Sequence, residues 1–132
     1  MKIDDLTGKV IRIAMEIHSG LGPGCYEKVY EDILYCELIK AGIPVERQIV
    51  FPVRYRNYQI QHGYKVDLLI DNRLIIELKT CETLADVHFR QIKTYLYLSN
   101  LKHGLILHFN VAKMKDGIYR IFNNFGRERM MG

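Results

Sequence analysis

The sequence of 132 residues predicts a mixed β-sheet with helices packed against it, an α/β (α+β) fold with the element order ααβββαββ. Two observations lead to this fold. Apolar residues recur at helical intervals before residue 40 and again after residue 83, whereas from residue 45 onwards they follow the alternating period of strands. Two apolar runs near the C-terminus supply the remaining strands, and a sheet of this kind buries its apolar faces under helices.

Two helices are predicted at the N-terminus. The first covers residues 5–19, and the glycine-rich stretch 19–24 ends it, because glycine and proline break helices. The second is expected over residues 24–40, and Gly42 is placed to end it. Its buried face should carry Tyr26, Val29, Tyr30, Ile33 and Leu38.

Three consecutive antiparallel strands are predicted in the middle of the chain, at residues 46–55, 59–70 and 74–80. These segments are rich in Val, Ile and Tyr, which favour strands, and short polar breaks separate them. The short breaks leave room only for tight connections, so neighbouring segments should pair with each other.

The last part of the chain predicts one helix and two strands. Residues 83–99 return to helical spacing, and the apolar run 104–109 suits a buried strand. A turn at Asp116–Gly117 precedes a last strand at 118–122, and the tail 126–132 is expected to be frayed.

The composition excludes several classes of protein. Hydrophobic residues make up 48% and charged residues 26%, as in a globular protein, and residues 1–132 are expected to form one domain. The apolar runs are too short to span a membrane, and charges interrupt the N-terminus where a signal peptide would be apolar, so the cytoplasm is the expected compartment. Three cysteines without a CxxC pair favour buried, reduced thiols.

The second and third strands carry charge on one face. Because side chains alternate along a strand, each strand has an apolar face and a second face. The apolar faces hold Tyr64, Val66, Leu68 and Ile70, and Leu74, Ile76 and Leu78. The second faces hold Lys65, Asp67 and Leu69, and Ile75, Glu77 and Lys79. The two apolar faces must coincide to build a core, which limits the possible registers.

A three-residue loop at 71–73 gives the register that we favour. It pairs Ile70 with Leu74, Leu68 with Ile76, Val66 with Leu78, Asp67 with Glu77, and Lys65 with Lys79. The last two pairs carry like charges, and each destabilises the sheet by roughly 0.2–1 kcal/mol. A slide by two residues would place Lys65 opposite Glu77, but it would also set Ile70 against Asn72 and lose core.

Facing carboxylates are a liability unless a cation lies between them. Oxygen ligands with open positions suit Mg²⁺ or Mn²⁺, and Lys79 lies two residues along the same face, near any anion that the metal recruits. The alternative is a solvent-exposed sheet face, on which Asp, Glu and Lys are routine. The strand pair alone does not choose between these two interpretations.

Other polar residues have both a structural and a functional interpretation. His88, Gln91 and Tyr95 share one face of the helix at 83–99 and could position a phosphate or a water, or they could mark the boundary of the core. Glu27 could cap the second helix or join the site, and His18 could stabilise the end of the first helix or act as a ligand.

Taken together, the motifs resemble a known family. Gly63-x-x-x-Asp67, Glu77-Leu78-Lys79-Thr80 and Gln91-x-x-x-Tyr95 resemble the PD-(D/E)XK nuclease superfamily, especially its RecB-like branch. Residues 21–30, LGPGCYEKVY, are similar to the signature of the GxxExxY proteins within that superfamily. The resemblance covers residues 11–123 and implies a restriction-endonuclease-like core, although Val66 stands where the family motif has proline.

The resemblance also implies roles for individual residues. Asp67 and Glu77 would hold a metal ion together with the Leu78 carbonyl, and Glu27 would complete the ligand set directly or through water. Lys79 would orient the attacking water or stabilise charge that develops on the phosphate. The remaining family positions would support the site or the substrate, namely Gln91, Tyr95, His88 and Tyr30.

The function that follows from this resemblance is hydrolysis of phosphodiester bonds in DNA with Mg²⁺ or Mn²⁺ as the cofactor. The net charge of +4 is compatible with a polyanionic partner. The alternatives are a non-catalytic module that binds nucleic acid or protein on this fold, and a subunit of a larger repair or defence complex. A domain this small has little room for a lobe that grips the substrate, which favours a homodimer or a protein partner.

Overall fold

The computed structural model describes residues 1–124, so the predicted tail 126–132 lies outside the described residues. The elements follow the predicted order, with a short 3₁₀ turn in place of the turn expected at Asp116–Gly117. They are α1 (Ile3–Leu21), α2 (Glu27–Lys40), β1 (Val45–Tyr55), β2 (Tyr58–Ile70), β3 (Leu74–Lys79), α3 (Asp86–Ser99), β4 (His103–His108), η1 (Met114–Gly117) and β5 (Ile118–Phe122).

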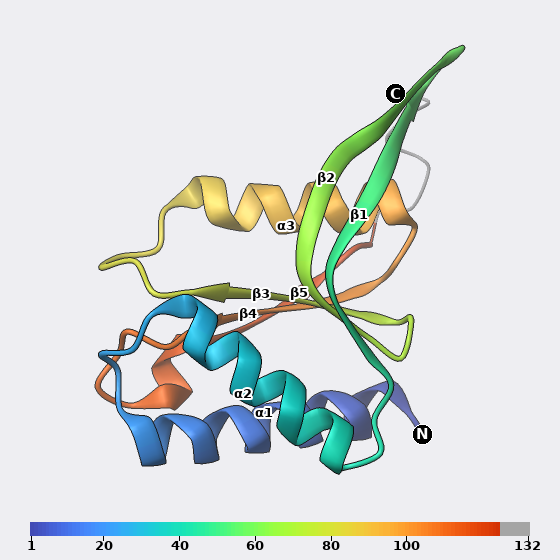
Figure 1. The fold of residues 1–132 in the computed structure, drawn as a ribbon. Helices are drawn as coiled ribbons and strands as arrows, with labels where there is room; N and C mark the ends of the chain where they lie inside the picture. Colours follow the sequence, from blue (N-terminus) through green and yellow to red (C-terminus); the bar gives the residue numbers. More distant parts are fainter. Residues whose placement is uncertain (125–132) are drawn as a thin grey trace.

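All five strands form one mixed sheet in the order β1-β2-β3-β4-β5. Neighbouring strands are antiparallel except β3 and β4, which are parallel because α3 carries the chain back across the sheet between them. Figure 1 shows α1 and α2 on one face of the sheet and α3 on the other. The predicted α+β architecture is therefore confirmed.

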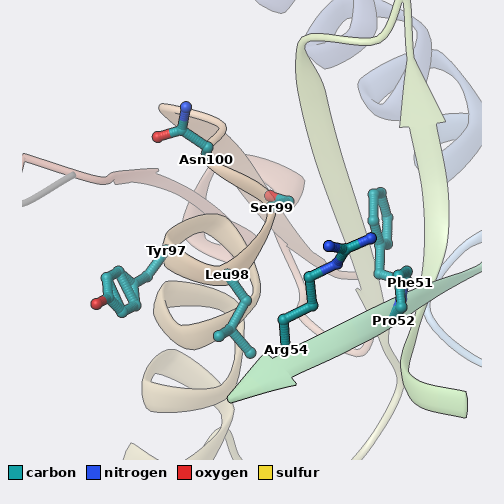
Figure 2. A pocket seen from close by; sticks show the side chains of 7 residues that line it. All are labelled: Phe51, Pro52, Arg54, Tyr97, Leu98, Ser99 and Asn100. Carbon is teal, nitrogen blue, oxygen red and sulfur yellow. The ribbon is translucent and has the colours of Figure 1, made fainter. Parts of the chain in front are cut away.

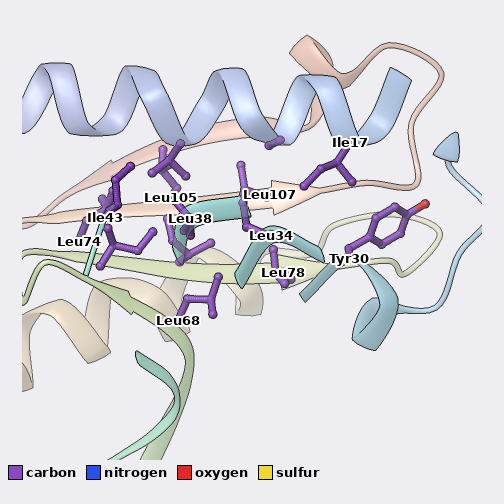
Figure 3. Close-up of a cluster of buried hydrophobic side chains, with 14 of the residues drawn as sticks. Ile17, Tyr30, Leu34, Leu38, Ile43, Leu68, Leu74, Leu78, Leu105 and Leu107 are labelled. Atoms are coloured by element: carbon purple, nitrogen blue, oxygen red, sulfur yellow. The ribbon is translucent and has the colours of Figure 1, made fainter. Parts of the chain in front are cut away.

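Two clusters of apolar side chains hold the layers together, one on each face of the sheet. Figure 3 shows the larger cluster, which joins α1 and α2 to the sheet through Ile17, Tyr30, Leu34, Leu38, Leu68, Leu78, Leu105 and Leu107, among others. The smaller cluster joins α3 to the opposite face through Val66, Leu69, Ile75, Ile92, Leu96, Ile106 and Ile121. Every residue from Leu74 to Leu78 is buried, because both faces of β3 are covered.

The start of α2 differs from the prediction. The helix begins at Glu27, and Tyr26 before it has an extended backbone with φ −67° and ψ 152°. Tyr26 is 85% exposed and Val29 is 37% exposed, so the prediction that both are buried was wrong. Tyr30 is buried as expected, and its hydroxyl accepts from the Cys25 N–H and donates to the Gly22 carbonyl. These two bonds shape the glycine-rich loop and delay the helix.

The thiols also differ from the prediction. All three cysteines are free, but none is fully buried: Cys36 is exposed, and Cys25 and Cys81 are partly exposed. Cys36 lies on the outer side of α2, where small residues are tolerated at the surface. Among residues 1–124, no helix has the length and the apolar character that crossing a membrane requires.

The register between β2 and β3 is confirmed where the two strands pair, at Ile70↔Leu74, Leu69↔Ile75 and Leu68↔Ile76. The pairing ends there, so the predicted pairs of Asp67 with Glu77, Val66 with Leu78 and Lys65 with Lys79 do not form. The reason is a bend in the β1–β2 pair: Gln48, which lies across from Asp67, has a positive φ of 53°. Beyond this bend β2 pairs only with β1 and turns away from β3.

The bend also splits the predicted apolar face of β2. Leu68 and Ile70 contribute to the cluster under α1 and α2, whereas Val66 and Tyr64 pack on the α3 side. Strands twist, and a two-stranded ribbon twists more strongly than a wide sheet. The expectation that these four residues share one face was therefore wrong on the outer side of Asp67.

Candidate functional site

Asp67 lies at the point where β2 leaves β3. Since the paired register ends at Leu68↔Ile76, the Leu78 N–H has no strand partner on that side. It donates instead to Oδ2 of Asp67 over 2.8 Å. The carboxylate thus replaces a strand carbonyl, and this bond fixes Asp67 beside the residues that follow Ile76 on β3.

Glu77 is the buried acid of this site. Its side chain is 7% exposed, and its Oε1 atom has no hydrogen-bond partner among the described residues. The pKa of Glu77 is raised to about 9, chiefly by burial and also by the charge of Asp67, while Lys79 opposes both effects. A buried carboxylate with an unsatisfied oxygen is costly unless a cation or a proton compensates it.

Glu27 comes from α2 and lies close to the acids of β2 and β3. As the first residue of α2, it follows directly on the loop that Tyr30 holds. Burial and the charge of Asp67 raise the pKa of Glu27, while Lys79 and the backbone of Thr80 lower it. These interactions place the Glu27 carboxyl at the C-terminal end of β3, close to both Asp67 and Lys79.

Lys79 is the one base that acts on these acids. Its charge lowers the pKa of both Glu27 and Glu77, so its ammonium group lies within electrostatic reach of the two carboxyls. Within residues 1–124 no direct ion pair engages its ammonium group, although Lys28 and Arg47 do form such pairs nearby. Lys79 is therefore available to an anion that approaches the acids.

Sequence reasoning missed two residues that extend the site, Glu31 and Gln48. Glu31 is 4% exposed, and the Gln48 amide donates to its carboxylate and, over 3.4 Å, to Oδ1 of Asp67. Glu31 follows Glu27 by four residues, and that spacing puts both acids on one face of α2. This spacing was a readable signal, whereas nothing in the sequence marked Gln48.

Tyr95 and Gln91 belong to the same predicted motif but lie differently. Burial raises the pKa of Tyr95, and the charges of Glu77 and Asp67 raise it further, so its ring lies near the acids. Gln91 is exposed on α3. Of the two, the structure brings only Tyr95 to the acidic residues.

The two candidate histidines have backbone partners. The Ala85 N–H donates to Nδ1 of His88 over 3.0 Å, which caps the start of α3. Nε2 of His18 lies 2.8 Å from the Val111 carbonyl, and this contact ties the end of α1 to the loop after β4. Both contacts are structural and separate from the acidic residues.

The donor set can be compared with the needs of a divalent ion. Among residues 1–124, no group of three or more His, Cys, Asp and Glu side chains is arranged so that it could hold a metal ion by itself. Mg²⁺, however, is commonly bound through one or two carboxylates with water and substrate phosphates completing its shell. The carboxylates of Asp67 and Glu77 fit that pattern. The Oε1 atom of Glu77 has no hydrogen-bond partner among the described residues, and Asp67 is held beside Leu78.

A hollow of about 390 Å³ lies elsewhere, between β1 and the C-terminal end of α3. Its lining residues are Phe51, Pro52, Arg54, Tyr97, Leu98, Ser99 and Asn100 (Figure 2). None of these side chains belongs to the acidic group. The acids therefore lie outside this hollow.

Comparison with known families shows which superfamily this fold belongs to. A model of the PD-(D/E)XK nuclease superfamily matches residues 4–121. The chain belongs to this superfamily. The match spans all the elements from α1 to β5 except their outermost residues, so the family covers the sheet, the helices and the acidic residues together. None of the curated proteins matches the chain.

Proposed function

We propose that this PD-(D/E)XK protein is a divalent-metal-dependent nuclease that hydrolyses phosphodiester bonds in DNA. The observation that carries the proposal is the buried Glu77 carboxyl, whose Oε1 has no partner and which lies beside a second acid, Asp67. Two acids in this arrangement need a compensating cation or a proton, and a divalent ion meets this need while it leaves both acids charged. The GxxExxY signature in residues 21–30 and the RecB-like order of motifs support the same assignment within a single domain, residues 1–132.

Four groups of the chain would hold the ion: the carboxylates of Asp67, Glu77 and Glu27, and the Leu78 carbonyl. All four are oxygen donors, which suits Mg²⁺ or Mn²⁺. When bound, such an ion supplies an acidified water and neutralises phosphate charge. The Asp67 bond to the Leu78 N–H keeps these donors in place before the ion arrives.

The other side chains act on the substrate or position the site. Lys79 holds a positive charge near Glu27 and Glu77, where it can stabilise the charge that develops on a phosphate. Tyr95 would steady the site from α3, whereas Gln91, exposed on the same helix, would contact the substrate away from the acids. Tyr30 and His88 are positioning residues, because the first shapes the loop before Glu27 and the second caps α3.

The test is the cleavage of DNA by the Glu77→Gln variant in Mg²⁺ and in Mn²⁺. Gln keeps the shape of a protonated carboxyl but cannot become a charged ligand. Metal catalysis contributes several kcal/mol, and 1.36 kcal/mol is a factor of ten, so the rate should fall by about 100-fold or more. Glu16→Gln on the exposed side of α1 is the matched control and should cleave like the parent.

The experiment has two informative failures. Equal cleavage by the parent and the Glu77→Gln variant would remove Glu77 from the mechanism. A parent that binds DNA but does not cleave it in either metal would favour the non-catalytic module over the nuclease.

A further inference from the structure

The net positive charge of the protein comes from one segment. Residues 47–66 contain four basic residues, Arg47, Arg54, Arg56 and Lys65, and no Asp or Glu. The whole chain has a net charge of +4, so the remaining Lys and Arg residues are balanced by Asp and Glu. We call residues 49–66 the basic ribbon, because they form the part of β1 and β2 that lies beyond the bend at Gln48.

The basic ribbon projects from the molecule as two strands. Figure 1 shows it rising away from the sheet and past α3. Its strands pair only with each other, down to Tyr55↔Tyr58 at the tip. At about 3.3 Å per residue, the arm is roughly 20 Å long. An isolated ribbon of this kind is marginally stable in water, so its persistence needs a support at the base.

Stacked aromatic rings supply this support and connect the ribbon to the acids. The rings of Phe51 and Tyr64 lie 5.3 Å apart, and those of Tyr64 and Tyr95 lie 4.6 Å apart. The Tyr64 hydroxyl also donates to the Tyr95 carbonyl over 3.2 Å. The charges of Glu77 and Asp67 raise the pKa of Tyr95, so this stack of rings runs from the base of the arm towards these two acids.

The outer charges of the arm form no ion pair among residues 1–124. Arg47, at the bend, pairs with Asp32 over 2.7 Å, whereas Arg54, Arg56 and Lys65 are exposed and form no ion pair in the part of the chain that the structure describes. Exposed rings accompany them. Tyr55 is 56% and Tyr58 67% exposed, and the Arg56 guanidinium lies 5.1 Å from the centre of the Tyr55 ring.

Arg54 also lines the hollow at the base of the arm, where Ser99 and Asn100 add polar side chains (Figure 2). An arginine beside a hydroxyl and an amide is a suitable environment for a phosphate oxygen. Exposed cations interleaved with tyrosines form a surface that matches a nucleic acid, whose phosphates are anionic and whose bases and sugars are flat or apolar.

We infer that the basic ribbon is an arm that binds the phosphate backbone of duplex DNA outside the cleavage site. A two-stranded ribbon fits the width of a DNA major groove, and Arg54, Arg56 and Lys65 lie along its length to meet phosphates. The choice of DNA as the ligand rests on the proposed function. The arm supplies the grip that a domain of this size otherwise lacks.

The test is DNA binding by the Arg54→Gln/Arg56→Asn double variant, measured without cleavage. Asn is chosen because Arg56 has a positive φ of 53°, which asparagine tolerates. Binding to a fluorescent duplex and to one of its single strands is followed by anisotropy in EDTA across a range of salt. Each lost phosphate contact lowers the slope of log K against log salt by about 0.9, so we expect a decrease of about 1.8 and a 10- to 100-fold loss of duplex affinity near 0.1 M salt.

The matched control is the Lys9→Gln/Arg12→Gln double variant, which loses the same charge from the exposed side of α1. It should keep the salt slope and the affinity of the parent. Equal losses in both variants would show a response to net charge alone and would overturn the arm. The inference is also overturned if the double variant of the arm binds duplex DNA like the parent. It is overturned as well if the variant loses affinity for the single strand but not for the duplex.

The outcomes for the arm and for the nuclease can be distinguished. Binding that depends on the arm in a parent that does not cleave DNA would uphold the arm and remove the proposed function. If the parent cleaves DNA but the arm substitutions leave its DNA affinity unchanged, the proposed function stands and the arm is overturned. If the substitutions change only the mass of the protein in solution and not DNA binding, the ribbon contacts a second copy and the inference fails.

Discussion

The inner and outer halves of the β1–β2 pair contrast strongly, although they belong to the same two strands. In the inner half, Leu68, Leu69 and Ile70 are buried and paired with β3, and the charges at its limit are acids. In the outer half the side chains are mostly exposed and the charges are basic. Burial by layers on both faces makes the inner half of β2 apolar, whereas β1 at the sheet edge is exposed at Glu46 and Arg47, and the outer half is free to take polar residues.

The boundary between the halves coincides with Asp67 and Gln48. On the inner side the acids are costly, because burial raises the pKa of Glu77 to about 9. On the outer side the cations are fully hydrated and cost little. The contrast teaches that the buried acids, whose charge destabilises the fold, lie where a metal ion can compensate them. The exposed cations, whose charge costs little stability, lie where a polyanion can reach them.

The largest effect is expected from Lys79→Met, which removes the basic charge near Glu27 and Glu77. If Lys79 stabilises charge on the phosphate, DNA cleavage should fall by about 100- to 1000-fold, as when one stabilising group is lost from other active sites. The measurement is the single-turnover rate in Mn²⁺. Lys102→Met, at an exposed position before β4, should leave the rate unchanged, and a similar loss in both variants would contradict the role of Lys79.

An intermediate effect is expected for stability as a function of pH and metal. The pKa of Glu77 is raised in the folded protein from 4.5 to about 9, so its contribution to stability is present below pH 4.5 and is lost as the pH rises towards 9. Without metal, the parent should match Glu77→Gln at pH 5 and be less stable than this variant at pH 9. Mn²⁺ at 100 times its Kd should stabilise the parent by about 2.7 kcal/mol and the variant by less.

Chemical denaturation in EDTA and in Mn²⁺ at both pH values measures all four combinations. A variant that gains as much from Mn²⁺ as the parent does would show that the ion binds away from Glu77. Parallel pH profiles of the two proteins would show that Glu77 ionises as freely in the folded as in the unfolded chain.

The smallest effect is expected from Tyr64→Phe at the base of the basic ribbon. The substitution keeps the ring stacking and removes the hydrogen bond to the Tyr95 carbonyl, which should cost about 1 kcal/mol of unfolding free energy. Tyr58→Phe at the exposed tip is the control and should cost nothing measurable. Hydrogen exchange would locate the change: amides of residues 49–66 should lose protection before those of β3, and uniform loss would show that the ribbon is not a separate unit.

The sequence predicted what depends on neighbouring residues. A three-residue connection fixed the pairing of Ile70 with Leu74, and the apolar run at 104–109 indicated the buried strand that β4 forms. Family motifs pointed to Asp67, Glu77 and Glu27 although these residues lie far apart in the chain. The order of motifs therefore carried more information about the site than composition or charge did.

The bend could not be predicted, because its signal is weak. Positive φ is typical of glycine, and Gln48 adopts it without being one. Without the bend, the alternation of β2 assigned Val66 and Tyr64 to the wrong face. Glu31 was missed for another reason: an acid in a helix is usually solvated, and only the contact from Gln48 across the sheet edge reveals its burial.

The position of β1 at the edge of the sheet has a consequence for the behaviour of the protein at high concentration. An open strand edge can recruit the same strand from another molecule and seed insoluble fibres. Here Pro52 supplies no N–H, and a bulge between Phe51 and Val53 interrupts the regular spacing, with Gly63 letting the two backbones approach closely. A strand from another molecule cannot form an unbroken ladder of hydrogen bonds along this edge. The long hairpin can therefore stay exposed without starting amyloid fibres.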